Sequence, residues 1–439
     1  MDKINVGLIG FGTIGTGVAR VLLDNAAVIS ERLGSEVVLK RVADRDTGRD
    51  RGLSLGEGVL VNDAELILND PDISIVIELV GGTGVAKDFV VKALEGGKHV
   101  VTANKALIST CGPELFGKAA AKGLDIGYEA SVGGGIPLLK SLTEGLVANN
   151  IESMYGIING TANYILSAMT NEGGSFDEVL RVAQAEGLAE ADPSYDVDGI
   201  DTAHKLSILL SLAYGIHLPP EEIFTEGIRA ISSVDIKFAE KFGWRIKLLA
   251  IARSGADGIE ARVHPAMIPA RHPLSAVEGA YNAVFLKGDA VGSVMLYGLG
   301  AGEMPTASAV VSDVVDICRN IKKGISRRVE PPYGGSMGAA GTALKPMEEL
   351  SMPYYVRFSA LDRPGVLSKI SGVFGEHGIS LSSVIQEERE EGGIVPLVLV
   401  THHAVERSFR DAVAEIENLD IVENKAVYVR IEERTGGAQ

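Results

Sequence analysis

A glycine-rich turn close to the amino terminus limits the possible folds of this chain more than any other feature. An apolar strand is expected at residues 4–9, Gly-Phe-Gly-Thr-Ile-Gly follows at residues 10–15, and an amphipathic helix is expected at residues 18–33. The order strand, G-x-G-x-x-G and helix is typical of a dinucleotide-binding α/β unit, in which glycines allow a tight turn and the close approach of a pyrophosphate. The residues predicted to form this site are Gly10, Phe11, Gly12, Thr13, Ile14 and Gly15.

Apolar segments continue to alternate with segments of helical length up to about residue 135. Further strands are expected at residues 36–43, 73–80, 98–102 and 124–129. Strands separated by helical lengths indicate a parallel, doubly wound sheet. Ligands bind at the carboxyl edge of such a sheet, and Gly81 and Lys105 stand just after two of the expected strands.

The end of the second expected strand bears on the choice of nicotinamide cofactor. Asp44 stands where an acid accepts a ribose hydroxyl of NAD, and Arg45 beside it is placed to meet the 2′-phosphate of NADP. Because the two side chains favour different cofactors, the sequence leaves NAD and NADP open.

Composition excludes several classes of partner. The chain has 439 residues, 46% of them hydrophobic, which suffices for two or three domains with their own cores. Its net charge of −17 argues against nucleic acid and anionic membranes as partners. Cys111 and Cys318 form neither a metal-ligand spacing nor a disulfide framework, and no apolar run reaches the roughly 18 residues that span a membrane. We expect a soluble cytoplasmic enzyme.

Acidic side chains are concentrated before one lysine in residues 185–205. Asp201 and Lys205 are four residues apart, so they share one face of the expected helix. Acids around a semi-buried ammonium suit either the grip on a substrate's amine or a positioned proton donor. A helix cap explains one or two of the acids, but not all six: Glu186, Glu190, Asp192, Asp196, Asp198 and Asp201.

Residues 129–136, Glu-Ala-Ser-Val-Gly-Gly-Gly-Ile, suggest a second ligand site. This segment offers one carboxylate, that of Glu129, and a glycine-rich backbone with accessible carbonyl oxygens. Oxygen ligands of this kind suit a hard cation. A glycine-rich loop that adjoins the nucleotide explains the same residues equally well, so both interpretations remain.

The pattern of the chain predicts an α/β protein with three domains. A Rossmann-like nucleotide-binding domain is expected at residues 1–135, joined by a helix at about 300–320, and a mixed α/β substrate domain at 136–300. Residues 321–352 are rich in Gly, Pro, Ser and basic residues and are interpreted as a linker. A third domain is expected at residues 353–432.

This last domain has a βαββαβ order, with strands expected at residues 355–360, 379–386, 395–401 and 427–431. Asp-Arg-Pro-Gly-Val-Leu at residues 362–367, followed by His-Gly-Ile-Ser at 377–380, resembles an ACT domain, a ferredoxin-like module that senses amino acids. Backbone N–H groups at the start of its helix would receive a carboxylate. The residues predicted to bind the effector are Asp362, Gly365, Val366, Leu367, Ile379 and Ser380.

Residues 183–205 carry the most specific resemblance in the chain. Written A-x3-G-L-x3-D-P-x2-D-x2-G-x-D-x3-K, they resemble the signature of homoserine dehydrogenases, and the order and length of the remaining segments agree with that family. The resemblance implies NAD(P)H-dependent interconversion of L-aspartate 4-semialdehyde and L-homoserine, in threonine, methionine and isoleucine biosynthesis. The ACT-like module implies an amino-acid effector, with L-threonine expected, and a homodimer or homotetramer.

The resemblance also implies roles for individual residues. Lys205 would donate the proton to the substrate oxygen, and Asp201 would orient Lys205. Lys105 would contact substrate and cofactor near the nicotinamide. Glu190, Asp196 and Asp201 would bind the substrate.

Two further sets of residues acquire a role in the same way. The ligands implied for a sodium-like ion are Glu129 and the backbone carbonyls of Val132, Gly134 and Ile136. The remaining residues implied to line the cofactor are Gly187, Gly302 and Glu303.

Other functions remain open at this point. A different ACT-bearing NAD(P)-dependent dehydrogenase, such as one that acts on a 2-hydroxy acid, commonly uses a histidine paired with an acid. His204 adjoins Lys205 but points about 100° away from it on a helix, so it does not easily replace the lysine. The chain could instead be a non-catalytic amino-acid sensor, and its last module could serve dimerisation without a ligand.

Overall fold

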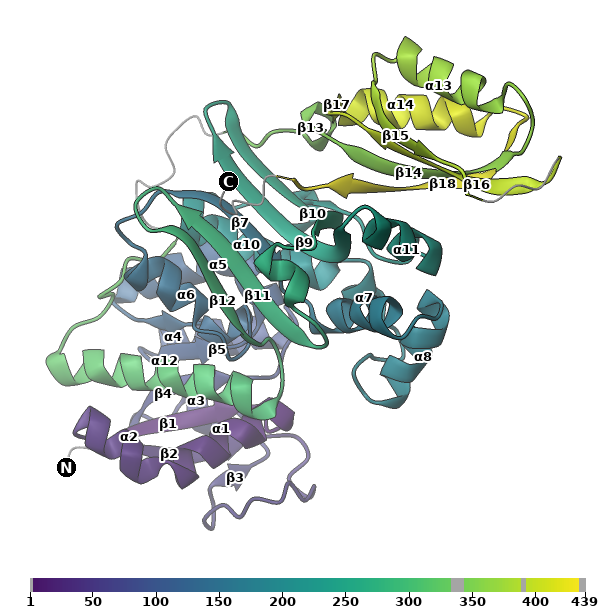
Figure 1. Ribbon diagram of the computed structural model, residues 1–439. Coiled ribbons are helices and arrows are strands. Elements are labelled where there is room, and N and C mark those ends of the chain that lie inside the picture. The colour runs from purple at the N-terminus through teal and green to yellow at the C-terminus, as the bar shows by residue number, and fades with distance from the viewer. Residues whose placement is uncertain (1–2, 333–342, 388–391, 434–439) are drawn as a thin grey trace. The chain divides into compact units, whose positions relative to one another are not determined.

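The computed structural model describes residues 3–332, 343–387 and 392–433 (Figure 1). The chain forms two compact units, each assembled from three segments. Unit 1 comprises Met1–Ile151, Ala203–Ile223 and Tyr281–Gly341. Unit 2 comprises Glu152–Thr202, Phe224–Ala280 and Thr342–Gln439.

Unit 1 contains a parallel sheet with the strand order β3-β2-β1-β4-β5-β6. The order reverses between β1 and β4, so the carboxyl ends of these two strands form the crevice where open α/β sheets bind ligands. This confirms the predicted doubly wound sheet. Its strands are β1 (Lys3–Ile9), β2 (Glu36–Ala43), β3 (Leu60–Val61), β4 (Ile73–Glu78), β5 (His99–Thr102) and β6 (Ile126–Gly127).

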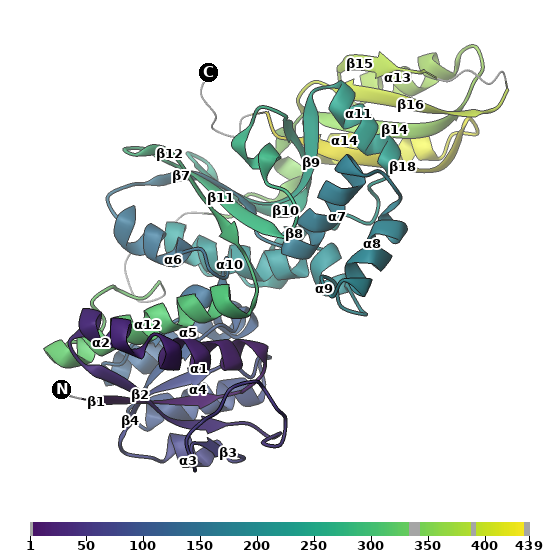
Figure 2. The same cartoon turned by 60° about the horizontal axis from the view of Figure 1, so that its bottom comes forward.

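Helices cover both faces of this sheet, and the central strands β1 and β4 are accordingly mostly apolar and buried. On one face Val6 and Leu8 pack with Val18, Leu22 and Val310, and Figures 1 and 2 show these helices side by side. They are α1 (Thr13–Asp24), α2 (Ala26–Leu33) and α12 (Glu303–Lys323). The helices that pack on the opposite face are α3 (Glu65–Leu68), α4 (Val85–Glu95) and α5 (Lys105–Lys122).

Two expected elements of this sheet are shorter than the sequence predicts. The helix expected at residues 18–33 is divided into α1 and α2 at Asn25, whose φ of −99° and ψ of 12° depart from helical values. The strand expected at residues 124–129 contains only two residues, because a short 3-10 helix, η1 (Glu129–Ser131), begins immediately after it.

The rest of unit 1 includes the segments that carry the predicted cation loop and Lys205. It includes the helical turn α6 (Leu138–Lys140) with η2 (Ser141–Gly145), and the antiparallel hairpin of β11 (Tyr281–Gly288) and β12 (Gly292–Leu299). Helix α10 (Ile200–Tyr214) begins at the end of one unit 2 segment and continues through unit 1.

Unit 2 is organised around a long sheet of order β7-β9-β10-β18-β14-β16-β15. Its first strands are β7 (Ile151–Ile157), β8 (Phe224–Thr225), β9 (Trp244–Gly255) and β10 (Gly258–Pro269), and β8 pairs with β10. Helices α7 and α11 pack against β9 (Figure 2). The helices of this part are α7 (Gly160–Asn171), α8 (Phe176–Ala185), α9 (Ser194–Val197) and α11 (Ser233–Lys241), with the 3-10 turn η4 (Pro273–Ala276).

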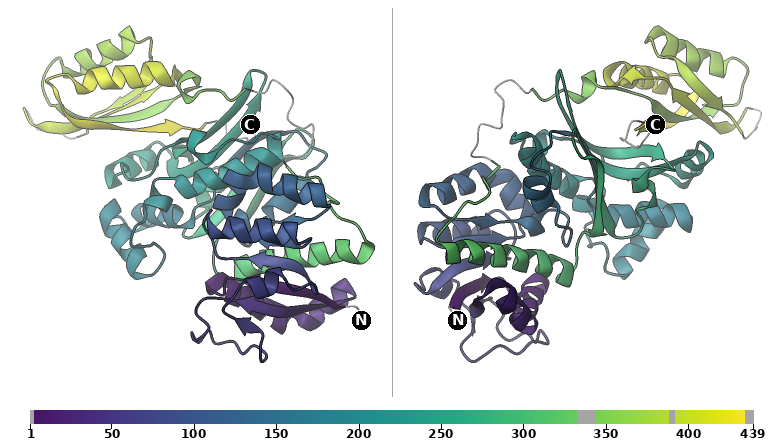
Figure 3. Two further views of the ribbon diagram at one scale, coloured as in Figure 1. Left: turned by 180° about the vertical axis from the view of Figure 1, so that it is seen from behind. Right: turned by 60° about the vertical axis from the view of Figure 1, so that its left-hand side comes forward.

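The C-terminal module of unit 2 confirms the predicted ferredoxin-like ACT fold. Its elements follow in the order β14 (Tyr354–Leu361), α13 (Val366–Glu376), β15 (Leu381–Ile385), β16 (Ile394–Thr401), α14 (Glu406–Glu417) and β18 (Val422–Ile431). Both helices cover one face of its sheet (Figure 3), around a core that includes Phe358, Phe374 and Phe409. The last strand pairs in parallel with β10 at Ala266 and Met267.

Several boundaries in this region differ from the prediction. Strand β15 starts at Leu381 rather than at residue 379, and β18 starts at Val422 rather than at residue 427. The linker expected at residues 321–352 begins inside α12 and ends with η5 (Met347–Glu349) and β13 (Ser351–Met352), which pairs with β17 (Ala404–Val405). Its residues 333–342 lie outside the described residues. No helix in the described ranges is long and apolar enough to cross a membrane.

Candidate active site

The glycine-rich turn between β1 and α1 has the geometry of a phosphate-binding loop. Gly10 has φ +98°, and a Cβ there would lie 2.7 Å from the carbonyl oxygen of Leu79. A Cβ on Gly15 would lie 2.1 Å from the oxygen of Gly10, so both glycines are required by close backbone packing. A Cβ on Gly12 would meet no atom within 4 Å. Gly12 therefore opens to free space at the amino end of α1, where helix N–H groups attract a phosphate.

A buried arginine that the sequence analysis missed, Arg51, bonds both the end of β2 and this turn. Asp44 accepts a hydrogen bond from the backbone N–H of Phe11 at 2.7 Å and forms an ion pair with Arg51 at 3.3 Å. The Arg51 side chain is 6% exposed, and its Nε donates to the Phe11 oxygen at 2.6 Å. Arg45 is exposed. The repeated basic residues of the segment, Arg45, Arg49 and Arg51, were the only signal for this contact in the sequence.

The ends of β4 and β5 are held together by Glu78, which the sequence analysis also missed. This buried carboxylate accepts hydrogen bonds from the N–H groups of Val80 and Gly81 and from the Thr102 hydroxyl, at 2.7, 3.1 and 2.7 Å. An acid inside an apolar strand was its signal in the sequence. The bonds shape the loop at Gly81, which has φ +82°, at the carboxyl edge of the sheet.

Helices α5 and α10, which carry the two predicted catalytic lysines, are joined by a hydrogen bond. Lys105 is the first residue of α5, and Lys205 on α10 is 8% exposed. One helical turn after Lys105, the Ser109 hydroxyl lies 2.7 Å from Nδ1 of His204. His204 thus contacts α5, and its bond with Ser109 fixes the packing of the two lysine-bearing helices.

In unit 2 the acidic segment converges on an asparagine that the sequence analysis did not single out. The side-chain amide of Asn159 donates to Asp196 at 2.7 Å and to Asp201 at 2.8 Å. Its oxygen accepts the N–H of Ala162 and so caps α7. Asn159 follows β7 and precedes Gly160, which was its only signal in the sequence. Glu190 is exposed.

The interpretation of all six acids as one group is wrong for three of them, because each has another partner. Asp198 forms an ion pair with Arg229 at 2.5 Å, Glu186 accepts from the Tyr164 hydroxyl at 2.9 Å, and Asp192 accepts from the Ser194 N–H at 3.1 Å. These bonds order the turns of the segment. Gly187, with φ +75°, lies in an exposed turn after α8.

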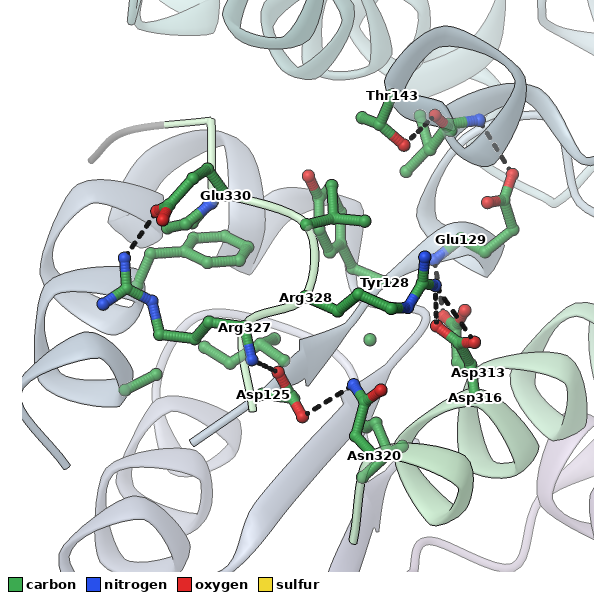
Figure 4. Close-up of a pocket in the computed structure, with 18 of the residues that line it drawn as sticks. Asp125, Tyr128, Glu129, Thr143, Asp313, Asp316, Asn320, Arg327, Arg328 and Glu330 are labelled. Carbon is green, nitrogen blue, oxygen red and sulfur yellow. Dashed lines mark hydrogen bonds and ion pairs between the residues drawn. The ribbon is translucent and has the colours of Figure 1, made fainter. Parts of the chain in front are cut away.

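The predicted cation loop in unit 1 carries a buried carboxylate with an altered acidity. Glu129 accepts backbone N–H groups of Leu139 at 2.8 Å and Lys140 at 2.9 Å (Figure 4). Burial, and secondly the charge of Asp313, raise the pKa of Glu129 to about 7. A cavity of about 120 Å³ borders both residues.

The backbone near Glu129 suits an ion with oxygen ligands. Val132, Gly134 and Ile136 are buried, and a Cβ on Gly134 would lie 2.4 Å from the Gly300 oxygen. One carboxylate beside backbone carbonyls is the donor set that a hard cation takes, and a positive charge would compensate the buried carboxylate of Glu129.

The two remaining predicted cofactor residues lie at the start of α12. Gly302 has φ +118° and is the residue before the helix. Glu303 forms an ion pair with Arg20 of α1 at 3.1 Å, and a Cβ on Gly17 would lie 2.7 Å from its Cγ. Glu303 therefore contributes to the packing of α12 on α1.

The ACT module has a cavity of about 210 Å³ at the start of α13. Of the predicted effector residues, Asp362, Gly365, Val366 and Leu367 line it, and Gly365 has φ +91°. Ile379 and Ser380 do not line it: Ile379 is buried in the core, and the Ser380 oxygen accepts the N–H of His402. Gln386, which follows the end of β15, lines the cavity and donates to Asp362 at 3.0 Å.

Comparisons with known proteins point to one family along nearly the whole chain. Family models match at residues 10–129 (homoserine dehydrogenase, NAD binding domain), 137–315 (homoserine dehydrogenase) and 354–420 (ACT domain). A homoserine dehydrogenase of Pseudomonas aeruginosa is 44% identical over 99% of this chain and 100% of its own length. The crystal structure of a homoserine dehydrogenase from Thiobacillus denitrificans is 45% identical, with a TM-score of 0.92 over 99% of both chains.

A hyperthermophilic archaeal homoserine dehydrogenase solved in complex with NADPH is 28% identical, with a TM-score of 0.61 over 72% of this chain and 97% of its own. It resembles this chain over a smaller part than the bacterial proteins do. The matches over nearly the full length, at identities above 40%, establish that the chain belongs to the homoserine dehydrogenase family.

Proposed function

We propose that this enzyme reduces L-aspartate 4-semialdehyde to L-homoserine, a step of threonine, methionine and isoleucine biosynthesis. The bound nicotinamide supplies a hydride to the aldehyde carbon, and the oxygen that becomes negative must receive a proton. Lys205 donates this proton, and Asp201, one turn earlier on α10, orients it. Lys105, at the carboxyl edge of the sheet, contacts substrate and cofactor.

The observation that supports this proposal most is the position of Lys205. Its ammonium is buried on a helix that the Ser109–His204 bond joins to α5, and a lysine in such a setting is a suitable proton donor. The direct test is the oxidation of NADH and NADPH by the purified chain with L-aspartate 4-semialdehyde. A chain that oxidises neither cofactor, while accepting a 2-hydroxy acid or no substrate at all, would disprove the proposal.

Glu190 and Asp196 bind the substrate in this proposal, as partners of its ammonium or hydroxyl group. Glu190→Gln is expected to lower kcat/KM for the semialdehyde by about 10–150-fold, since a charge-assisted hydrogen bond contributes roughly 1.5–3 kcal/mol. Glu172→Gln, at the exposed end of α7, is the control for the loss of one surface charge. Equal kcat/KM in both variants would remove Glu190 from the site.

Cofactor choice is proposed to depend on Asp44 and Arg45. Arg51 donates to the backbone oxygens of Phe11, Arg49 and Asp46, so the exposed Arg45 is the better partner for a 2′-phosphate. We expect Arg45→Ala to raise KM for NADPH and to leave KM for NADH nearly unchanged, because only NADPH carries that phosphate. Equal changes with both cofactors, measured by steady-state kinetics, would show that Arg45 is structural.

A sodium-like ion is proposed at Glu129 and the carbonyls of Val132, Gly134 and Ile136. Burial raises the pKa of Glu129 from 4.5 to about 7, so the charged carboxylate costs stability as pH rises through this window. A bound cation would favour the charged form. Sodium chloride should therefore raise the melting temperature more at pH 8 than at pH 5, relative to choline chloride at equal ionic strength. An equal effect at both pH values would argue against a site at Glu129.

The ACT module is proposed to bind an amino-acid effector, L-threonine, in the cavity at Asp362, Gly365, Val366 and Leu367. The N–H groups at the start of α13 suit a carboxylate, and the left-handed conformation of Gly365 lets the ligand approach. We also propose a homodimer or homotetramer, since closed symmetric assemblies are usual for soluble oligomers. Sedimentation would determine the assembly, and calorimetry with L-threonine would test the effector.

A further inference from the structure

A single strand connects the effector cavity with a buried ion cluster at the far end of the ACT module. The cavity is lined by Ala360 and Leu361 at the carboxyl end of β14. At the other end of β14, Tyr354 pairs with Arg430 of β18. At 3.2–3.4 Å per residue the two ends of this strand lie roughly 23 Å apart. Strand β14 therefore forms a continuous covalent connection between the cavity and the residue that pairs with Arg430.

Arg430, on the last strand of the ACT module, contacts a segment outside the module that follows β8 and precedes α11. Its side chain is 1% exposed and donates to Glu406 of α14 at 2.5 and 2.8 Å. On its other side it donates to both carboxylate oxygens of Glu226, at 2.5 and 3.2 Å. Tyr354 donates its hydroxyl to Glu406 at 2.7 Å. The Arg430 guanidinium is thus bound by two carboxylates, that of Glu406 within the ACT module and that of Glu226 outside it.

The segment after Glu226 is packed tightly against the acidic segment. The N–H of Ile228 donates to the Val197 oxygen at 2.9 Å, and Arg229 pairs with Asp198. A Cβ on Gly227 would lie 2.3 Å from the Val197 oxygen, so the two backbones are in direct contact. Residues 226–229 are therefore bonded to, and closely packed on, residues 197–198.

The displaced residues adjoin the predicted substrate side chains. Asp196 immediately precedes Val197 at the end of α9, and Asn159 holds Asp196 and Asp201 together. A cavity of about 320 Å³ borders Glu226, Arg229, Asp198 and Tyr428. Close-packed interiors move between discrete arrangements. This cavity leaves room for a second arrangement of the side chains around the Arg430–Glu226 ion pair.

We propose that the Arg430–Glu226 ion pair is the joint through which the ACT module controls the substrate-binding acids Asp196 and Asp201. This inference rests on the proposed effector function. The effector acts on β14, β14 moves Arg430, and Glu226 carries the movement through residues 227–229 to Asp198 and its neighbours. An effector inhibits only by favouring one of two states, and the two states here differ in the arrangement of this joint.

The test is a pair of full-length variants, Glu226→Gln and Arg229→Gln, which weaken the joint on either side of Gly227. Arg430 keeps Glu406 in the first variant, so the module should remain folded, which melting temperatures will show. Both variants should bind L-threonine in calorimetry and keep their uninhibited kcat. Allosteric coupling typically changes affinity by about 5–150-fold. In both variants the ratio of kcat/KM without threonine to kcat/KM at saturating threonine should therefore approach one.

Glu348→Gln is the matched control, because Glu348 also pairs with an arginine of the ACT module, Arg407, but on its exposed surface. It should be inhibited like the unsubstituted enzyme. Glu226→Gln that binds threonine and is fully inhibited would overturn the joint alone. An unsubstituted enzyme that neither binds nor responds to threonine or another amino acid would overturn the effector proposal as well.

Discussion

Replacing Lys205 with alanine is expected to lower kcat by about 10²–10⁴-fold, the usual contribution of general acid catalysis. The affinity for NADPH should stay nearly unchanged, because in the proposed mechanism the ammonium acts on the substrate oxygen rather than on the nucleotide. Steady-state rates with L-aspartate 4-semialdehyde and a fluorescence titration with NADPH measure the two quantities. If the variant keeps more than about a tenth of the original kcat, Lys205 contributes less than general acid catalysis requires.

Lys98→Met provides the control for removal of a buried lysine. Lys98 precedes β5, at the edge of the sheet opposite to the ligand crevice, and its ammonium donates to the Ile73 oxygen at 2.9 Å. Its loss should lower the melting temperature and leave kcat nearly unchanged. A similar loss of kcat in both variants would mean that the Lys205 effect reflects general damage to unit 1.

Replacing Glu432 with glutamine is expected to destabilise the protein by about 3–5 kcal/mol, the usual cost of removing one partner of a buried ion pair. Glu432 follows β18, is 2% exposed and accepts from Arg253 at 2.5 Å and Arg262 at 2.7 Å. The Arg262 side chain is 1% exposed. Without Glu432 the Arg262 guanidinium remains buried with less compensating charge, and the partly exposed Arg253 loses the nearer of its two carboxylate partners. Urea unfolding, followed by fluorescence, measures the difference.

The effect of Glu432 should depend on pH in a defined direction. The nearby Arg262 and Arg253 lower the pKa of Glu432 below its ordinary value of 4.5 against the opposing effect of burial. Its stabilisation is therefore present above pH 4.5 and is lost as pH falls through the lowered pKa. The difference from Glu432→Gln should narrow in that acid range. Glu433→Gln, an exposed neighbour, is the control and should behave like the unsubstituted protein.

The same contacts decide how the regulatory module should be studied. A chain shortened near Lys345 is expected to lose the proposed L-threonine sensitivity. The same truncation also removes Glu432 and β18, the strand that pairs with β10. Its loss of stability would then accompany the loss of regulation. Single substitutions at the Arg430–Glu226 pair separate the two effects.

Local features of the sequence were sufficient to predict the architecture. The alternation of strands and helices predicted the parallel sheet, and the glycine turn between the first strand and helix predicted the nucleotide site. The βαββαβ pattern predicted the ACT module in the same way. Lys205 and Asp201 were predicted because their spacing of four residues places them on one helical face. Such periodicities and short motifs are properties of neighbouring residues, so the sequence displays them directly.

Tertiary structure decided which side chains meet. Asn159 donates hydrogen bonds to Asp196 and Asp201, which lie 37 and 42 residues further along the chain. Arg51 donates to Phe11, which lies 40 residues before it. The acids of one short segment were assigned to different partners, since Arg229 and Tyr164 approach from other elements. The Arg430–Glu226 pair joins residues 204 positions apart. Contacts of this kind depend on how strands and helices are placed after folding, and no spacing along the chain encodes them.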